Sequence, residues 1–270
     1  MCRSLSVSRS GYYEWLSRPL SQRRQDDQVL SERICEHFET NRRVYGTRRL
    51  KECLEEEGKQ VSRRRIGRLM VANDLQVNTK RKFKPTTDSN HGQAVAENVL
   101  NREFDVETPD TAYVGDITYI WTAEGWLYLA VVIDLFSRAV VGWSMSRWLR
   151  APLVSAALQM AIDQRQPLPG LIMHTDRGSQ YVSDDYQQLI DQYHMIPSMS
   201  RKANCWDNAV AESFFHTLKT ECLYLEDFET RDEARDAVFD YIEVFYNRQR
   251  RHSSNGYLAP LVFEQTQKAA

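Results

Sequence analysis

The feature that most restricts the fold of this chain is a set of three strand-like runs that starts near residue 111. They are YVGDITYI, WLYLAVVIDLF and AVVGWSMS, all rich in β-branched and aromatic residues and separated by short turns. The middle run is almost continuously apolar, which is typical of a strand that is buried on both faces of a sheet. The runs therefore predict three antiparallel strands inside a substantial domain.

The remainder of the chain alternates between predicted helices and strands. A helix over 151–165 is followed by the strand-like LIMHTD, the helical SDDYQQLIDQYH, the strand-like IPSMS and two longer helices. The resulting order, βββ-α-β-α-β-α-α, predicts an α/β fold in which helices flank a mixed sheet.

The front of the chain differs from the rest in charge. Residues 1–90 carry 20 Lys and Arg against 12 Asp and Glu, whereas residues 91–270 carry 15 against 25. Basic surface attracts phosphates, and acidic surface repels them unless its carboxylates hold metal ions. The asymmetry favours two modules with different partners, although two ordinary solvated faces would give the same balance.

Three short helices are predicted in the basic part, over 26–39, 47–58 and 63–74, with Gly58 as a C-cap and Ser62 as an N-cap. They indicate a helix-turn-helix DNA-binding module over 26–78, or else an amphipathic helix with a solvated basic face. Residues 1–25 are expected to form a partial helical element whose partner helix lies upstream of Met1, and 79–110 a linker to a core over 111–270. The candidate DNA-binding residues of the module are Arg63, Arg64, Arg65 and Arg68.

Several classes of protein are excluded by composition. No run approaches the ~18 apolar residues of a membrane span. The five cysteines are scattered without a C-x-x-C pair, so neither a zinc site nor a disulfide framework is expected. Scattered single cysteines are typical of a reducing compartment, and a cytoplasmic protein is expected.

Three acidic residues stand where packing does not explain them. Asp116 lies inside the first strand run, Asp176 follows the apolar run LIMH, and Glu212 lies on a predicted helix over 207–221. A lone buried carboxylate costs several kcal/mol, so each needs a partner, which could be one Arg or Lys or a divalent metal held by several carboxylates. The spacing of 35 residues between Asp176 and Glu212 does not decide between these, because chance alone gives about four such pairs.

Long segments of the chain resemble a known family. VGDITYI, HTDRGSQY and SMSRKANCWDNAVAESFFHTLKTE resemble the three catalytic blocks of bacterial insertion-sequence transposases with a retroviral-integrase-type core, in particular the second-frame product of the insertion-sequence-three family. YIEVFYNRQRRHSSNGYLAP resembles the C-terminal block of that family. SGYYEW, with YGTRRL and GKQVSRRRIGRLM, resembles its helix-turn-helix segment.

The resemblance implies an RNase H-like fold and a catalytic triad of Asp116, Asp176 and Glu212, which would also hold two Mg²⁺ ions, with Mn²⁺ able to substitute. The implied activity is cleavage of transposon ends and transfer of the 3′-hydroxyl into target DNA. The implied partners are transposon-end and target DNA, the first-frame product or its frameshift fusion, and further copies of the chain on DNA. No membrane is implied, and the location would be the bacterial nucleoid.

Other residues take supporting parts in this hypothesis. His174 and Asn208 are expected to shape the site, and Lys219, which lies on the same predicted helical stripe as Glu212, is expected to contact a phosphate. A basic cluster near the C-terminus would hold phosphates or form a solvated helix end, and it consists of Arg248, Arg250, Arg251 and His252. The rival hypotheses are an RNase H-type nuclease that does not join DNA and a DNA-binding regulator with an inert core.

Overall fold

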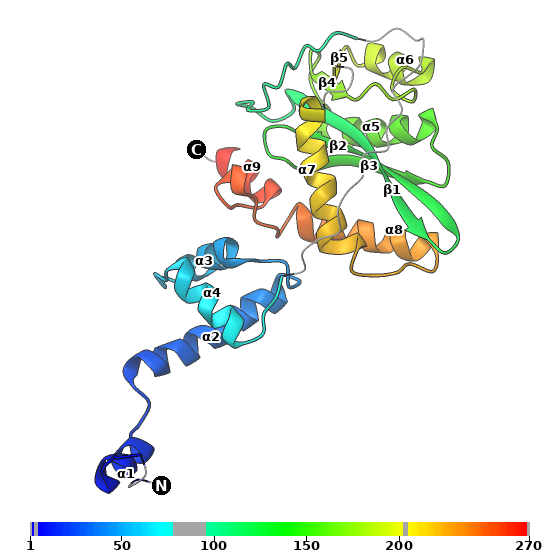
Figure 1. Cartoon of the computed structure of the whole chain (residues 1–270). Coiled ribbons are helices and arrows are strands. Elements are labelled where there is room, and N and C mark those ends of the chain that lie inside the picture. The colour runs from blue at the N-terminus through cyan, green and yellow to red at the C-terminus, as the bar shows by residue number, and fades with distance from the viewer. Residues whose placement is uncertain (1, 3–4, 78–95, 202–204, 269–270) are drawn as a thin grey trace. The chain divides into compact units, whose positions relative to one another are not determined.

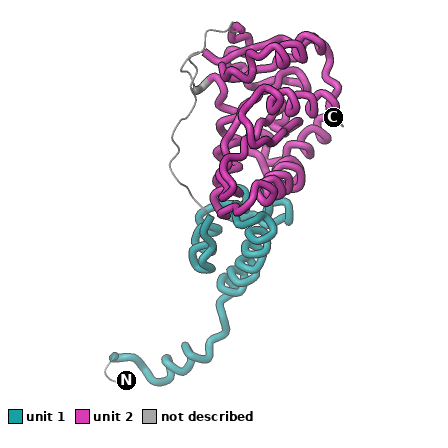
Figure 2. The backbone as a smooth tube through the Cα atoms, turned by 90° about the vertical axis from the view of Figure 1, so that its right-hand side faces the viewer, with its two compact units in different colours: residues 1–77 teal, residues 78–270 magenta. Residues whose placement is uncertain are grey.

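The computed structural model describes residues 2, 5–77, 96–201 and 205–268, and divides the chain into two compact units, residues 1–77 and 78–270 (Figure 2). Within the described residues, no helix is long and apolar enough to cross a membrane. Each unit has its own hydrophobic core, and the two units are therefore packed separately.

The first unit is entirely helical, with α1 (Arg9–Ser17), α2 (Gln22–Thr40), α3 (Thr47–Glu56) and α4 (Arg63–Ala72). The side chain of Ser62 caps α4 by accepting from the Arg65 amide at 3.3 Å. Gly58, with φ +75°, ends α3 in the left-handed conformation that glycine adopts without strain. Helices α2, α3 and α4 share an apolar core made of Leu30, Ile34, Phe38, Leu50, Leu54, Ile66 and Leu69.

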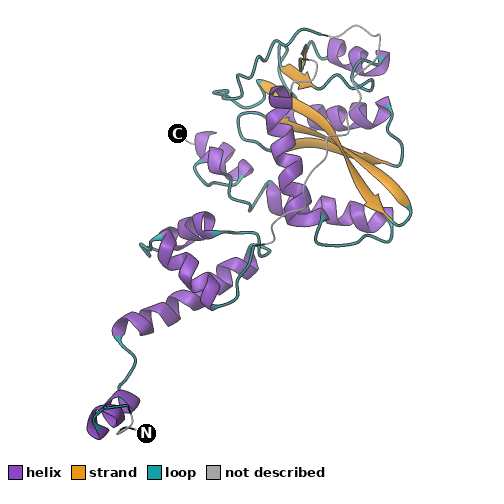
Figure 3. Ribbon diagram, in the orientation of Figure 1, coloured by secondary structure: helices purple, strands orange, loops and turns teal. Residues whose placement is uncertain are grey.

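The second unit is built on a five-stranded mixed sheet of order β3-β2-β1-β4-β5. Its strands are β1 (Ala112–Thr122), β2 (Gly125–Asp134), β3 (Val140–Ser146), β4 (Ile172–Thr175) and β5 (Ile196–Met199). The first three are antiparallel, and β4 and β5 run parallel to β1. The predicted mixed sheet and the predicted order of elements are confirmed (Figure 3).

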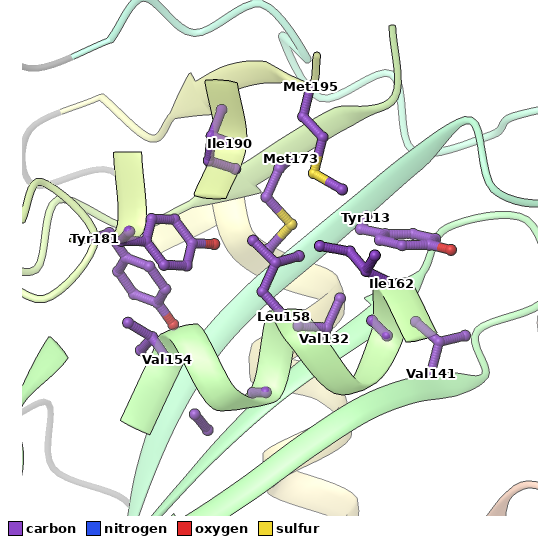
Figure 4. Packing of buried hydrophobic residues seen from close by; sticks show 14 of the residues in the cluster. Tyr113, Val132, Val141, Val154, Leu158, Ile162, Met173, Tyr181, Ile190 and Met195 are labelled. Carbon is purple, nitrogen blue, oxygen red and sulfur yellow. The ribbon is translucent and has the colours of Figure 1, made fainter. Parts of the chain in front are cut away.

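The two faces of the sheet are covered by different helices (Figure 1). Helices α5 (Ala151–Arg165) and α6 (Asp184–Gln192) cover one face, and their core includes Tyr113, Val132, Leu158 and Met173 (Figure 4). Helices α7 (Ala209–Leu218) and α8 (Arg231–Phe239) pack on the other side of β1. Both helices continue into π-helical segments, Lys219–Leu223 and Asp240–Tyr246.

Residues 96–110, the later part of the expected linker, fall in the second unit, where Leu100 is buried and Ala96 packs against the core. The earlier part, 79–95, lies outside the described residues. A C-terminal helix, α9 (Pro260–Lys268), was not predicted, and its Glu264 is buried in an ion pair with Arg165.

Candidate active site

The register of β1 and β4 brings two of the three acidic residues together. Gly115 of β1 is aligned with Thr175, the last residue of β4. Asp116 and Asp176 are the next residues along two adjacent parallel strands, whose separation is about 4.8 Å. Because β4 stops there and β1 continues, Asp116 and Asp176 lie at a step in the sheet.

Each of these carboxylates is oriented by its own backbone. Asp116 Oδ1 accepts from the Ile117 amide at 2.8 Å, and Asp176 Oδ1 accepts from the Gly178 amide at 2.9 Å. The backbone amides therefore fix the orientation of the two carboxylates.

The electrostatics of the site favour a cation. Burial raises the pKa of Asp116 well above its ordinary value, and the charges of Asp176 and Glu212 raise it further. The hydrogen bond from Ile117 and the charge of Lys219 act in the opposite direction. Like charges in a partly dehydrated site disfavour joint ionisation unless a positive charge lies among them.

Glu212 lies on helix α7, within electrostatic reach of Asp116. Its neighbours Ala211, Phe214 and Phe215 are buried against the domain, whereas Glu212 lies on the exposed side of the helix. Partial desolvation raises its pKa. Among the described residues, no three His, Cys, Asp or Glu side chains converge closely enough to hold a metal ion. Glu212 is thus within electrostatic reach of Asp116 but is not gathered with the two aspartates.

The residues present fit a hard divalent cation in their chemistry. Asp116, Asp176 and Glu212 offer only oxygen donors, the ligand type that Mg²⁺ prefers. The Oδ1 atom of Asn208 is buried without a hydrogen-bond partner among the described residues, while its Nδ2 donates to the Gly115 carbonyl at 3.4 Å. Asn208 lies beside Gly115, the residue that precedes Asp116. A bound water or metal ion would give the buried Oδ1 atom of Asn208 a partner.

Lys219 lies at the junction of α7 with the π-helical segment and is half-buried. Burial lowers its pKa, and the charge of Asp116 acts in the opposite direction. Lys219, expected on the same helical stripe as Glu212, thus has its charge within electrostatic range of Asp116.

His174 is fully buried in β4, and both of its ring nitrogens are engaged. Nδ1 lies 2.8 Å from the Ser198 hydroxyl and Nε2 lies 3.1 Å from that of Ser200. Burial lowers the pKa of His174 to about 4, so the ring is neutral at ordinary pH. These contacts of His174, two residues before Asp176 in the chain, link β4 to Ser198 of β5 and to Ser200.

Asp207, which is not among the site residues expected from the sequence, fixes the start of helix α7. Its buried carboxylate accepts from Arg201 at 2.8 and 2.9 Å, from Arg102 at 2.7 Å and from Asn98 at 3.0 Å. These contacts fix the turn before α7 to the 97–102 segment. Asn208 occupies the N-cap position but makes no capping hydrogen bond.

The predicted DNA-contact residues divide into two groups. Arg63 and Arg64 are exposed on α4, and Arg248 is exposed near the C-terminus. Arg65 and Arg68 both pair with Asp27 of α2, each at 2.7 Å, and so they stabilise the first unit.

Two further basic residues lie near the C-terminus. Arg251 donates to the Tyr257 carbonyl at 3.2 Å. Arg250 departs from the expectation, because it is buried in a bidentate pair with Glu221 and is not available to a phosphate.

Comparisons with known proteins cover the same segments. Models described as "Integrase core domain" match residues 107–205 and 212–267, and one described as "HTH-like domain" matches residues 24–83. A simian T-cell lymphotropic virus intasome chain is similar in structure, with TM-score 0.49 and 16% identity over 86% of this chain and 74% of that one. The HTLV-2 integrase catalytic core domain has TM-score 0.44 and 19% identity over 58% of this chain and 97% of that one.

Relatives at the sequence level are much more similar. "Insertion element IS600 uncharacterized 31 kDa protein" of Shigella sonnei is 45% identical over 98% of this chain and 97% of its own length. "Transposase InsF for insertion sequence IS3A" of Escherichia coli (strain K12) is also 45% identical, over 98% of this chain and 92% of its own. The chain therefore belongs to the IS3 family of insertion-sequence transposases, with an integrase-type catalytic core.

Proposed function

We propose that Asp116, Asp176 and Glu212 are the catalytic carboxylates with which this transposase cuts transposon ends and joins their 3′-hydroxyls to DNA. Transposition and DNA integration are the activities of this family, and its integrase core depends on a divalent metal. The observation that carries the assignment is the β1–β4 register, which sets Asp116 beside Asp176 at the end of β4.

We propose that the metal is Mg²⁺, that two ions bind and that Mn²⁺ can replace them. The three carboxylates would hold the ions, and Asn208 Oδ1 would face their hydration shell. The chemistry supplied by a bound pair of ions is activation of the attacking water or 3′-hydroxyl and stabilisation of the leaving oxygen. The raised pKa of Asp116 supports this proposal. Neighbouring acids that repel one another when ionised are stabilised in their charged form by a bound cation.

The protein supplies positioning in addition to the carboxylates. Lys219 would hold a phosphate oxygen of the DNA end near Asp116, since a half-buried ammonium is an effective point-charge partner for a phosphate. Asp207 and its arginine partners would fix the start of α7 and, through this helix, the place of Glu212. The helix-turn-helix module would hold the DNA mainly through its phosphates, with further copies of this chain and the first-frame product as protein partners.

The test is a set of variants that keep shape and remove charge. Asp116→Asn, Asp176→Asn and Glu212→Gln should each abolish end cleavage and strand joining in Mg²⁺ and in Mn²⁺, while binding of a duplex transposon end stays within about twofold of wild type. The matched control is Asp185→Asn, an exposed acid on α6 that should leave both reactions unchanged.

The assay follows a labelled 3′-hydroxyl end, so that joining is separated from hydrolysis. Wild-type joining by any one of the three variants removes that residue from the site. Hydrolysis by the wild-type chain without any joined product would instead support the nuclease hypothesis.

A further inference from the structure

Four aromatic side chains form a continuous row on one face of the β1–β2 hairpin. Tyr119 is aligned with Tyr128 and Trp121 with Trp126. The ring centroids of Trp121 and Trp126 are 4.9 Å apart, those of Trp126 and Tyr119 are 6.1 Å apart, and those of Tyr119 and Tyr128 are 5.2 Å apart. All three pairs have the edge-to-face geometry that aromatic rings prefer. This set is called the aromatic row below.

The tryptophan rings of the aromatic row are exposed to solvent because the rest of the unit covers only the opposite face of the hairpin tip. Along β1, Ile120 and Thr122 stay buried up to the tip, whereas Trp121 is 61% exposed. On β2, Leu127 is buried and Trp126 is 47% exposed. Side chains alternate between the faces of a strand, so one face of the hairpin is packed and the other presents the aromatic row. Two exposed Trp side chains together are an unusual patch for a soluble surface.

The hairpin that carries the row is held firmly from its other side. Arg231, at the start of α8, donates to the carbonyls of Glu124 at 2.7 Å and Trp126 at 3.1 Å. The Thr122 hydroxyl donates to the Gly125 carbonyl at 2.7 Å across the turn. The rings are therefore displayed on a fixed support, which lowers the entropy that binding a ligand would cost.

The row lies on the opposite face of β1 from Asp116, because side chains alternate along a strand and Asp116 falls on the same face as the buried Ile120 and Thr122. Tyr119 lies three residues after Asp116 on the same strand, or about 10 Å along it, and Trp121 about 16 Å. The pKa of Tyr119 is raised by burial and, in smaller part, by the charges of Tyr128, Asp176 and Asp116. The row is thus within electrostatic reach of the carboxylates but presents its rings on the other face of the hairpin.

Cationic side chains lie next to the row. Ser146, the last residue of β3, is aligned with Tyr128. Directly after it, the guanidinium groups of Arg147 and Arg150 each lie 5.3 Å from the centroid of the exposed Trp148 ring. Exposed rings interleaved with arginines are the composition of surfaces that bind single-stranded nucleic acid, in which rings stack with bases and cations follow the phosphates.

We propose that the aromatic row is a base-stacking platform that holds unpaired bases of the DNA on which this transposase acts. Unpaired bases fit this surface because they present the flat π-faces that duplex DNA keeps inside its stack. A second copy of this chain is a weaker match, since Arg147 and Arg150 favour a polyanion. The inference rests on the proposed function, because the DNA in question is the substrate strand.

The test measures binding without chemistry. The full chain, in EDTA, is titrated with a short oligothymidylate and with a strand of equal length that consists only of abasic nucleotides, which keeps the phosphates and removes the bases. Wild type should bind oligothymidylate more tightly than the abasic strand. The double variant Trp121→Ala/Trp126→Ala should lose about tenfold or more in affinity for oligothymidylate and little for the abasic strand.

Two matched variants separate stacking from damage to the fold. Trp121→Phe/Trp126→Phe keeps flat rings and should retain most of the preference for bases. Tyr224→Ala removes an exposed aromatic residue elsewhere on the same unit and should change neither affinity. Intrinsic tryptophan fluorescence, quenched by oligothymidylate in wild type, should be quenched much less in the double alanine variant.

Equal wild-type affinity for the two strands would overturn the platform, as would an unchanged base preference in the double alanine variant. A shift in the sedimentation of the DNA-free double variant, with base preference intact, would assign the row to a protein contact instead. Failure of the proposed function has a different signature. In that case the wild-type chain binds oligothymidylate through the row but neither cleaves nor joins DNA in Mg²⁺.

Discussion

Arg250 and Glu221 form a buried bidentate pair, in which Arg250 Nε donates to Glu221 Oε2 at 2.6 Å and Nη2 donates to Oε1 at 2.7 Å. The pair joins the middle of the π-helical segment Lys219–Leu223 to the segment after Tyr246. The Tyr241 hydroxyl donates to the same carboxylate at 2.8 Å. Arg250 thus stabilises the fold near helix α7.

Removing one member of this pair should destabilise the chain strongly. Arg250→Ala leaves the Glu221 charge buried without its partner, so the free energy of unfolding should fall by about 3 kcal/mol or more. Arg248→Ala, at an exposed position, should change it by less than about 0.5 kcal/mol. Urea unfolding of both variants checks this, and equal stabilities would contradict the structural role of Arg250.

The arginines of α4 should separate into DNA contacts and structural residues. Arg63→Ala/Arg64→Ala should reduce the slope of log affinity against log salt by roughly 1 for each phosphate that the variant no longer neutralises, with little change in stability. Arg65→Ala/Arg68→Ala should lower the unfolding temperature of the first unit, because Asp27 loses both of its partners. Salt titrations with duplex DNA and thermal unfolding decide the matter, and an unchanged slope in the Arg63/Arg64 variant would indicate a solvated face.

Lys219 should act on DNA and not on the metal. Lys219→Ala removes the ammonium charge near Asp116, so binding of the transposon end and strand joining should fall together. The Mg²⁺ concentration for half-maximal joining should not rise. Lys219→Arg should retain much of the activity, since a charge suffices for a single phosphate contact. Wild-type end binding by Lys219→Ala would remove Lys219 from the site.

Asp207 should position the catalytic helix. Asp207→Asn weakens charge-assisted hydrogen bonds from Arg102 and Arg201, and we expect a loss of about 2 to 3 kcal/mol in unfolding free energy. Strand joining should fall more than duplex binding, because the turn that precedes Glu212 is loosened. Asp232→Asn, which breaks an exposed pair with Arg235, is the control and should cost no more than about 1 kcal/mol.

Buried His174 should make the chain lose stability as the solution becomes acidic. Its pKa is lowered from 6.5 to about 4 in the folded chain. Between these pH values, His174 binds a proton in the unfolded chain but not in the folded chain. This contribution is complete above pH 6.5 and is lost as the pH falls toward 4, by about 3 kcal/mol in all.

Urea unfolding at several pH values tests this sign. His174→Asn should have a flatter pH dependence between 4 and 6.5 than wild type. His194→Asn, at an exposed position with φ +52° that Asn tolerates, is the control and should keep the wild-type slope. A steeper slope in His174→Asn would contradict the neutral buried ring.

The sequence by itself determined the elements and most of their order. Apolar alternation and the near-continuous run through Val131 predict strands because a strand buried on both faces has no polar side to solvate. Ser62 and Gly58 mark the helix ends correctly because capping is a local interaction. The fold class followed from the order of the elements, since few arrangements bury a βββ-α-β-α-β pattern.

The partners of the charged residues were decided only by the tertiary structure. Asp134 follows an apolar strand run just as Asp176 does, yet it is fully buried and accepts from Ser137 N, Ser137 Oγ and the Asp110 amide, so its role is to fix a turn. Arg250 lies in the same basic run as Arg248 but is buried against Glu221. The hydrogen bonds and the burial of these side chains depend on residues far apart in the chain. A local sequence pattern therefore does not show whether an acid pairs with an amide, an arginine or another acid.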